Sequence, residues 1–355
     1  MSWTVRGPDL GNVGAVTLRW GAVLAVFSFV LALSAAPAAA AQAPASVCTV
    51  SDKRITELSG LVSDGQRWYA INDGGSKIQV FVLGRDCAVQ RVITNSLDPY
   101  DVEDLARAAD GTLWLSDTGD NDKKRETVAL VALTPQGKAT LYRLTYPDGQ
   151  HDVEALLLDR HGTPYLVTKT PFGDSGIYRP VSALKSPGPT PLEKVGTLEF
   201  KPTNTPGGPV AGFGSVLVTG AATSADGTVV ALRTYTDAYL YSAPDGDVSA
   251  ALKRDPVRVP LPDEQQGEAL AFEPDGTLLS GGEGTRQPIR AVKDATSMAK
   301  PATNDRTPAA AGGETGTGAG GSSGMGGAPA LVLAVCIAAG GLFALTKLRR
   351  RFSRK

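Results

Sequence analysis

Short apolar runs alternate with turn residues between about Ser46 and Asp294, and no long stretch repeats its apolar positions every 3.6 residues. Runs of four to eight residues rich in Val, Leu, Tyr and Thr are typical of β-strands. The first group predicts the strands SGLVS, QRWYAIN, KIQVFVLG and AVQRVIT, and the next predicts EDLARA, TLWLSD, ETVALVAL and KATLYRLTY. The pattern therefore predicts an all-β domain.

One stretch, DVEDLARAADGTLWLSD at 101–117, recurs in weaker copies that begin at Glu57, Asp152, Leu217 and Gln266. Each copy is an apolar strand that opens with acidic or small polar residues, a Gly-containing turn and a second strand. Regular repeats of this length with four strands each are typical of a β-propeller. We predict about five four-stranded blades. The third repeat is longer and leaves room for a sixth, although we interpret its stretches KSPGPTPLEK and KPTNTPGGPVAGFGS as loops.

The last repeat has no fourth strand, whereas a spare strand, SVCTVSDKR, precedes the first repeat. Propellers commonly close when one terminus completes the other terminus's blade, which removes an exposed edge. This closure would bring Cys48 beside Cys87, in the turn between the third and fourth strands of the first blade. Because Cys336 lies in an apolar run, Cys48 and Cys87 remain as a pair, and we expect a disulfide. Two free cysteines are the alternative.

Both ends of the chain carry targeting signals. Residues 1–41 combine Arg6 and Arg19 with the uncharged run 20–33 and the small-residue tract SAAPAAAA, which predicts a signal peptide; an uncleaved anchor is the alternative. The propeller is expected over 42–300 and a Gly/Ser/Thr/Ala-rich linker over 301–327. Residues 328–346 are uncharged and long enough for one transmembrane helix, with a buried soluble helix as the alternative. The basic tail 347–355 then predicts a cell-membrane protein with its N-terminal domain outside and its C-terminus in the cytoplasm.

The charge balance changes once these segments are set apart. The chain has a net charge of −1, and removing six positive charges in the tail and one net positive charge in 1–41 leaves about −8. An acidic exported domain argues against nucleic acid as a partner, because phosphates would be repelled. It favours cations or neutral ligands.

Acidic residues align at the opening of each first strand. Period-two alternation puts two aligned positions on one face, which in a propeller lines the central channel. The first position holds Ser59, Glu103, Glu154, Thr219 and Glu268, and the position two residues earlier holds Glu57, Asp101, Asp152, Leu217 and Gln266. Carboxylates this close destabilise a fold unless a cation or hydrogen bonds compensate, and Ca²⁺ accepts six to eight oxygens. We therefore take Glu103, Glu154, Glu268, Asp101 and Asp152 as candidate calcium ligands. The alternative is that they bond backbone amides of neighbouring blades or line a wet channel without metal.

The loops on the same side form an expected ligand face. They include SLDPYD, DTGDND, YPDGQHD, TPFGDSG and PDEQQGE, with Tyr100, Phe172 and Phe213 as apolar contacts. DTGDND lacks the alternate-residue spacing and distal Glu of an EF-hand, so a solvated turn is the alternative. The candidate ligand-binding residues at the ends of the second strands and beside them are Asn72, Asp73, Asp117, Lys169, Arg233 and His151. For Lys169 and Arg233, pairing with the acidic ring is the alternative role.

Catalytic constellations are scarce. His151 and His161 are the only histidines, which excludes zinc sites of the His and Cys type. The chain has no G-x-S-x-G elbow, P-loop or dinucleotide fingerprint. His151 is a candidate general base, and the alternative is that it is a histidine of a surface loop without a catalytic role.

The D-V-E-x-L openings at Asp101 and Asp152, G-E-A-L at Gly267, the A-D-G turn and the S-D ending resemble secreted bacterial propellers called esterase-like phytase proteins. They are also similar to the calcium-dependent six-bladed propellers that include gluconolactonase-like enzymes. The resemblance covers about Glu57 to Glu283 and implies a metal or ligand at the acidic mouth. This chain departs from the pattern at Ser59 and Thr219, and it lacks a basic cluster matched to a highly phosphorylated substrate.

Two functions follow from these observations. The first is a membrane-anchored extracellular module that binds a small molecule, glycan or protein at the acidic mouth; the tether and the scarcity of catalytic groups favour it. The second is a calcium-dependent hydrolase of phosphate or carboxylic esters, in which the metal polarises the bond. An enzyme needs metal with an open coordination position, whereas a binding module does not.

Overall fold

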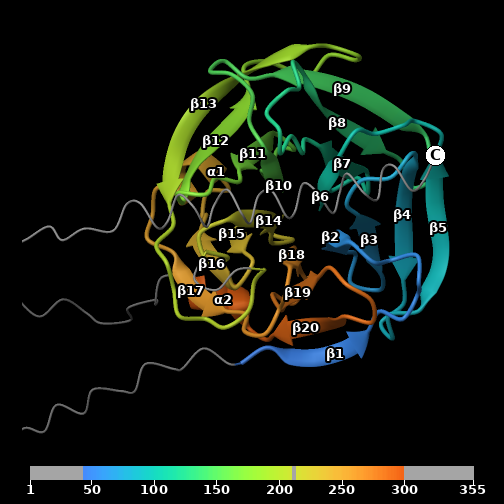
Figure 1. The fold of residues 1–355 in the computed structure, drawn as a ribbon, viewed down its shortest axis with the longest axis vertical. Helices are drawn as coiled ribbons and strands as arrows, with labels where there is room; N and C mark the ends of the chain where they lie inside the picture. The colour runs from blue at the N-terminus through green and yellow to red at the C-terminus, as the bar shows by residue number, and fades with distance from the viewer. Residues whose placement is uncertain (1–42, 210–212, 300–355) are drawn as a thin grey trace, which may run out of the picture. The chain divides into compact units, whose positions relative to one another are not determined.

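The computed structural model describes residues 43–209 and 213–299, which form a β-propeller (Figure 1). The predicted signal peptide, linker, membrane helix and basic tail lie outside these residues. Within the described ranges, no helix is long and apolar enough to cross a bilayer.

The described strands form five blades of four strands each, and blades 2 and 3 are joined into one eight-stranded sheet. Blade 1 contains β2 (Leu58–Ser63), β3 (Trp68–Asn72), β4 (Ile78–Leu83) and β5 (Val89–Asn95), and blade 2 contains β6 (Val102–Arg107), β7 (Leu113–Asp117), β8 (Val128–Leu133) and β9 (Ala139–Thr145). Blade 3 contains β10 (Val153–Leu158), β11 (Pro164–Thr168), β12 (Asp174–Pro180) and β13 (Thr190–Glu199), and blade 4 contains β14 (Val218–Thr223), β15 (Val229–Thr234), β16 (Asp237–Ser242) and β17 (Val257–Pro260). Blade 5 contains β18 (Gly267–Phe272), β19 (Leu278–Gly282) and β20 (Pro288–Val292), and its outer strand is β1 (Ala45–Thr49).

The blades close on one another around their first strands. β2 contacts β6, β6 contacts β10, β10 contacts β14, β14 contacts β18, and β18 contacts β2. Five clusters of buried hydrophobic residues each lie between two neighbouring blades. Both faces of each blade are therefore covered, which explains why strands such as VALVAL in β8 are apolar throughout rather than alternating.

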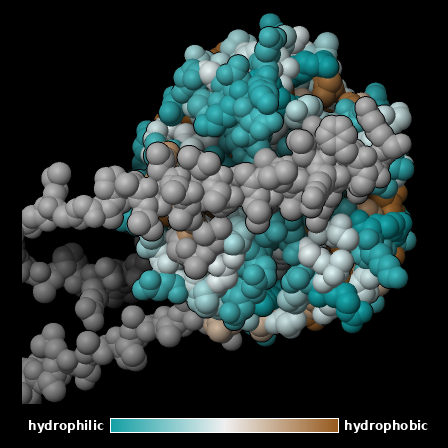
Figure 2. Space-filling model, in the orientation of Figure 1, coloured by the Kyte–Doolittle hydropathy of each residue, from teal (hydrophilic) through white to brown (hydrophobic). Residues whose placement is uncertain are grey.

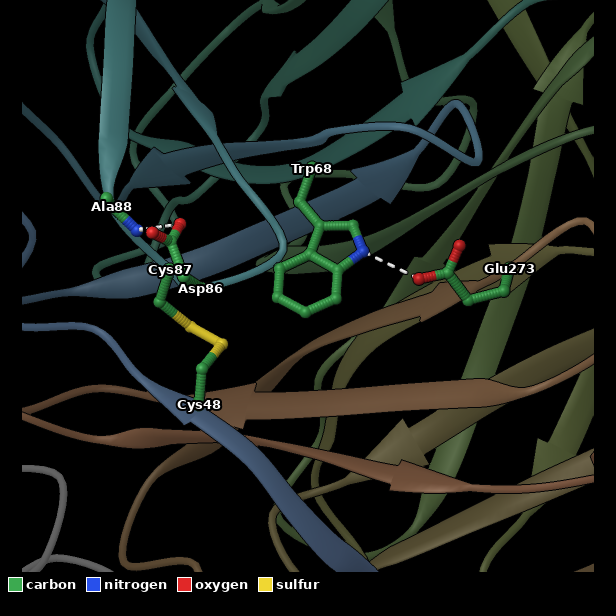
Figure 3. The surroundings of a disulfide bond; sticks show 6 residues. All are labelled: Cys48, Trp68, Asp86, Cys87, Ala88 and Glu273. Atoms are coloured by element: carbon green, nitrogen blue, oxygen red, sulfur yellow. Dashed lines mark hydrogen bonds between the residues drawn. A yellow bond between two sulfur atoms is a disulfide. The ribbon is translucent and has the colours of Figure 1, made fainter.

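The closure of the last blade by the N-terminal strand agrees with the sequence prediction. β1 pairs antiparallel with β20, and Cys48 of β1 forms a disulfide with Cys87 in the turn between β4 and β5 (Figure 3). Beside this bond, the indole of fully buried Trp68 donates to Oε1 of Glu273 at 2.7 Å. The disulfide thus joins the outer strand of blade 5 to blade 1.

A β-bulge recurs at the same place in all five first strands. The pairing register shifts between Leu58 and Gly60, and it does the same at the aligned position of β6, β10, β14 and β18. The extra residue in each case is one of the aligned set Ser59, Glu103, Glu154, Thr219 and Glu268. A bulge re-aims the side chain that it carries, so simple period-two alternation, on which the prediction rested, does not hold at this position.

One predicted loop is wrong in part. The end of KSPGPTPLEK belongs to β13, whose Thr190 and Pro191 also pair in parallel with β9 of blade 2. Leu192 is buried in the core between blades 2 and 3, which draws this Pro-rich stretch into the sheet. Two short helices, α1 (Val248–Ala251) and α2 (Ala295–Ala299), complete the described elements.

Candidate functional site

Carboxylates converge at the mouth formed by the openings of the first strands. Asp73, Asp101 and Glu103 form one group, and Glu103, Asp152 and Glu154 form a second, with ligand atoms within 4.8 Å of one another in each group. Glu103 is shared and only 1% exposed. The structure therefore brings together four of the five predicted calcium ligands and adds Asp73, which we had assigned to the ligand face.

Gly119 makes room for this cluster. A Cβ at this position would lie 2.7 Å from Oδ2 of Asp101 and even closer to Oε1 of Glu103. The glycine belongs to the DTGDND loop, whose backbone approaches the carboxylates directly: the amide of Asp120 donates to Oδ1 of Asp152 at 2.8 Å. The loop thus holds the cluster in place.

Asp117, a predicted ligand-binding residue, has a different role. Its Oδ1 accepts from the amides of Tyr100 and Asp101 at 3.1 and 2.8 Å and lies 3.1 Å from Nη2 of Arg125. The guanidinium of Arg125 also lies over the ring of Tyr100. These contacts fix the segment that carries Asp101 into the cluster.

Lys169 supplies a positive charge beside the carboxylates. Its Nζ lies 2.5 Å from Oε1 of Glu154 and 5.0 Å from the ring centre of Tyr235. Burial alone would lower the pKa of Lys169, but the charge of Glu154 and the groups around it raise that pKa well above its ordinary value, so the ammonium stays charged. One lysine does not balance the carboxylates around it.

Glu268, the fifth predicted metal ligand, lies within electrostatic range of Glu154, Lys169 and Asp73. Burial, followed by the charges of Glu283 and Glu154, raises its pKa well above the ordinary value. The side chain is 2% exposed, and its Oε2 has no hydrogen-bond partner among the described residues. The raised pKa favours the neutral acid, and a buried polar oxygen without a hydrogen-bond partner costs free energy.

These donors suit a hard divalent cation. The cluster offers carboxylate oxygens only, which Ca²⁺ prefers and accepts in flexible geometry, and a cation would compensate the mutual repulsion of the side chains. Glu103 would be the central ligand, with Asp73, Asp101, Asp152 and Glu154 beside it. The alternative interpretation was that the aligned carboxylates accept hydrogen bonds from backbone amides of neighbouring blades. It holds for Asp152, which accepts from the amide of Asp120.

Arg233 is not available to a ligand. It is fully buried, and its Nε and both terminal nitrogens donate to backbone oxygens, with Nη2 also 2.7 Å from Oε2 of Glu264. Its donors hold β15 against β18 and β19. Our assignment of Arg233 to ligand binding is therefore replaced by the pairing role that we gave as its alternative, with Glu264 in place of the aligned ring.

His151 lies in a small polar and aromatic group instead of among the carboxylates. Its Nε2 lies 2.8 Å from Oδ1 of Asp148 and 3.0 Å from the hydroxyl of Tyr178. The ring also packs edge-on against Tyr146. The side chain is 21% exposed, which agrees with a loop histidine that is partly covered.

Asn72 and Asp73 line a pocket of about 220 Å³ together with basic residues that include Lys53 and Lys77. The side chain of Asn72 accepts from the amide of Glu57 at 3.3 Å and donates to the carbonyl of Arg54 at 2.6 Å. Asn72 thus fastens the segment before β2 to the end of β3.

Asp104 was missed by the sequence analysis. It is fully buried, and its carboxylate accepts from the amides of Leu156 in β10 and Ala221 in β14 at 2.8 and 3.1 Å, besides the amide of Leu105. Burial raises its pKa well above the ordinary value, while these amides act in the opposite direction. One side chain thereby ties three first strands together at the centre of the propeller.

The surface around the propeller is mostly polar. Figure 2 shows one face of the molecule, in the orientation of Figure 1, and on its coloured part hydrophobic residues form only small, separate patches. Tyr100 and Phe172 are 50% and 65% exposed and belong to the loops that precede Asp101 and follow Lys169. They are apolar groups on loops beside the acidic mouth.

The comparisons with known proteins concern solved structures. No protein-family model and no curated protein matches the chain. A gluconolactonase from Xanthomonas campestris matches with 14% identity over 69% of this chain and 79% of that chain, at a TM-score of 0.39. Virginiamycin B lyase from Staphylococcus aureus matches with 15% identity over 67% and 70% of the two chains, at 0.34. The soluble aldose sugar dehydrogenase from Escherichia coli matches with 12% identity over 70% and 98%, at 0.41.

All three TM-scores are below 0.5 and all three identities are below 25%. The propeller is shown by the strand pairing and the contacts between first strands described above, and the resemblance to esterase-like phytase proteins stays a prediction.

Proposed function

We propose that this protein is a cation-dependent binding module, with Ca²⁺ held at the acidic mouth by Glu103 and its neighbours. The observation that carries the proposal is that Glu103 belongs to two groups of carboxylates at once and is almost fully buried. Buried like charges favour a state in which a cation neutralises them. A bound cation with open coordination positions would then coordinate an oxygen atom of the ligand.

The ligand is proposed to be an extracellular small molecule, glycan or protein. The disulfide between Cys48 and Cys87 supports a location outside the cytoplasm, where such bonds persist. Exposed Tyr100 and Phe172 offer apolar contacts on loops beside the cation. The membrane anchor predicted from the sequence would hold the module at the cell surface.

Calorimetric titration of the purified protein with Ca²⁺ tests the cation site. We expect saturable binding that Glu103→Gln abolishes and that Asp110→Asn, a change in an exposed hairpin carboxylate, leaves intact. At a hundredfold excess of Ca²⁺ over its Kd, linkage gives about 2.7 kcal/mol of added stability. For a domain of this size that corresponds to a rise in Tm of roughly 5 °C.

The same variants distinguish a cation site from a purely structural one by the sign of the effect. In chelator, Glu103→Gln removes one repelling charge, so it is expected to be at least as stable as the wild type, and it gains nothing from Ca²⁺. Absence of binding heat, together with a Glu103→Gln protein that is less stable in chelator, would show that the carboxylates serve the fold alone.

A calcium-dependent hydrolase of phosphate or carboxylic esters is the second candidate. Lys169 favours it, because a buried ammonium beside the carboxylates would stabilise negative charge that develops on a polarised substrate. Release of p-nitrophenol from p-nitrophenyl phosphate and p-nitrophenyl acetate, in Ca²⁺ and in chelator, is the assay. Activity that requires Ca²⁺ and drops at least a hundredfold in Lys169→Met supports the hydrolase, and no release of p-nitrophenol above the buffer rate excludes it for these substrates.

A further inference from the structure

A second hollow lies at the other end of the first strands. It has a volume of about 770 Å³ and is lined by the far ends of these strands and by the hairpins that follow them. The acidic residues open the same strands, and β6, for example, is six residues long. Four residue steps lead from Glu103 to Arg107, and at about 3.3 Å per residue roughly 13 Å separates the acidic mouth from the hairpin end.

Asp104 stands between the two ends. It follows Glu103 of the acidic cluster, and the residues whose amides it accepts, Leu156 and Ala221, line the cavity. None of the clustered carboxylates of the acidic mouth lines the cavity. The cavity is a site of its own and not a continuation of the acidic mouth.

The floor of the cavity is apolar and exists because of small side chains. Leu61, Leu105 and Leu156 lie beneath its base and are at most 1% exposed, and the half-buried Val62, Ala106 and Trp114 present apolar surface to the cavity. Ala221 of blade 4 stands at the position where the other four blades have leucine, so it leaves space on that side of the cavity. Such an apolar hollow with a few polar groups at its edge is typical of a small-molecule site.

The rim of the cavity carries three carboxylates and two guanidinium groups, which differ in how far other groups engage them. The carboxylates of the lining are engaged by amides of their own hairpins; Asp110 accepts from Thr112, Asp159 from His161 and Thr163, and Asp226 from Thr228. The side chains of Arg107, Arg160 and His161 line the same rim and are exposed. Arg160 is also held in place, because its Nη2 donates to the carbonyl of Asp226 at 3.2 Å.

We infer that this cavity binds a small amphipathic anion, with its apolar body against Val62, Ala106 and Trp114 and its carboxylate at Arg107 and Arg160. A guanidinium binds a carboxylate through paired, charge-assisted hydrogen bonds. Contact between the apolar lining and a hydrocarbon body removes apolar surface from water, which favours binding. The site is independent of the cation site proposed above.

Decanoate is the probe, and decanol and decyltrimethylammonium are its neutral and cationic counterparts, all below their aggregation concentrations. Binding is followed by calorimetry and by the fluorescence of Trp114, which lines the cavity, whereas Trp68 is fully buried beside the disulfide. We expect one decanoate per chain, at least tenfold tighter than decanol, with decyltrimethylammonium weaker still. Chelator and Glu103→Gln leave this affinity unchanged, which separates the site from the acidic mouth.

Two variants and a matched control locate the site. Arg107→Gln/Arg160→Gln is expected to weaken decanoate about tenfold and leave decanol unchanged, whereas Arg91→Gln on the outer strand β5 alters neither. Ala109→Trp, at an exposed rim position, is expected to block both ligands without loss of Tm. Flotation with phosphatidylglycerol vesicles distinguishes a free acid from a lipid headgroup as the source of the anion.

No saturable binding of decanoate overturns the inference, and so does binding that Ala109→Trp leaves intact. Equal affinities for decanoate and decanol, or no response to the double arginine change, overturn the assignment of an anionic ligand.

Discussion

Removal of the disulfide is expected to loosen the closure of the propeller in a measurable way. Cys48→Ala/Cys87→Ala leaves the pairing of β1 with β20 in place but frees β1 from blade 1. The bond acts mainly by restricting the unfolded chain, so the cost of losing it depends on the loop that it closes.

The cysteines are 39 residues apart. The chain-entropy relation for a loop of that length gives about 4 kcal/mol at 25 °C. For a domain of 150–250 residues, each kcal/mol shifts Tm by about 2–4 °C, and this propeller lies at the upper end of that range, so we expect a loss of about 8 °C.

Thermal unfolding gives the global effect, and hydrogen exchange locates it. The amide of Val50, which donates to the carbonyl of Gln287 at 2.9 Å, reports on the attachment of β1. Its exchange is expected to accelerate far more than that of core amides in β8, while reductant reproduces the change in the wild type only. A Tm within 2 °C of the wild type, with Val50 exchange unchanged, would refute the view that the bond holds the closure.

Three further results are expected. Asp104→Ala leaves the amides of Leu156 in blade 3 and Ala221 in blade 4 without this acceptor, which costs about 1–3 kcal/mol for each. Chemical unfolding should show a loss of stability several times that of Asp110→Ala, and equal losses would contradict the role of Asp104 in joining the blades. Gly119→Ala forces a methyl group into the carboxylates, so calorimetry should show Ca²⁺ binding weakened at least tenfold with the far-ultraviolet circular dichroism unchanged. Hydrogen bonds from Arg54 lower the pKa of Asp52 to about 2. The stabilisation from Asp52 is therefore present above pH 3.8 and lost as the pH falls towards 2, and the difference in unfolding free energy between the wild type and Asp52→Asn should vanish over that interval; a difference that persists at pH 2 would contradict this assignment.

The repeat made most of the architecture predictable. Five openings aligned at Glu103 and its counterparts, together with the missing fourth strand of the last repeat, indicated both the blades and the closure by β1. The disulfide was expected from that closure, because the pairing of β1 with blade 5 brings Cys48 beside Cys87. These inferences needed only spacing and the rule that sheet edges are covered.

The roles of individual polar residues were harder to predict. Asp104 differs from Gly60, Ala155, Gly220 and Ala269 at the aligned position, and this outlier was the one available signal for it. What it contacts depends on how closely the first strands approach, which a single sequence does not contain. For Arg233 the sequence left two roles open for the same reason, because the strands that its side chain contacts, β18 and β19, lie in another blade.

The pairing of β1 with β20 also imposes an order on events during synthesis. β1 leaves the ribosome roughly 240 residues before its partner, a delay of about 12–50 s at 5–20 residues per second. Cys87, in contrast, emerges soon after Cys48, so the two can be oxidised long before blade 5 exists. The covalent bond would then keep β1 beside blade 1, where it cannot pair with another chain, until β19 and β20 have been synthesised and the sheet of blade 5 is complete.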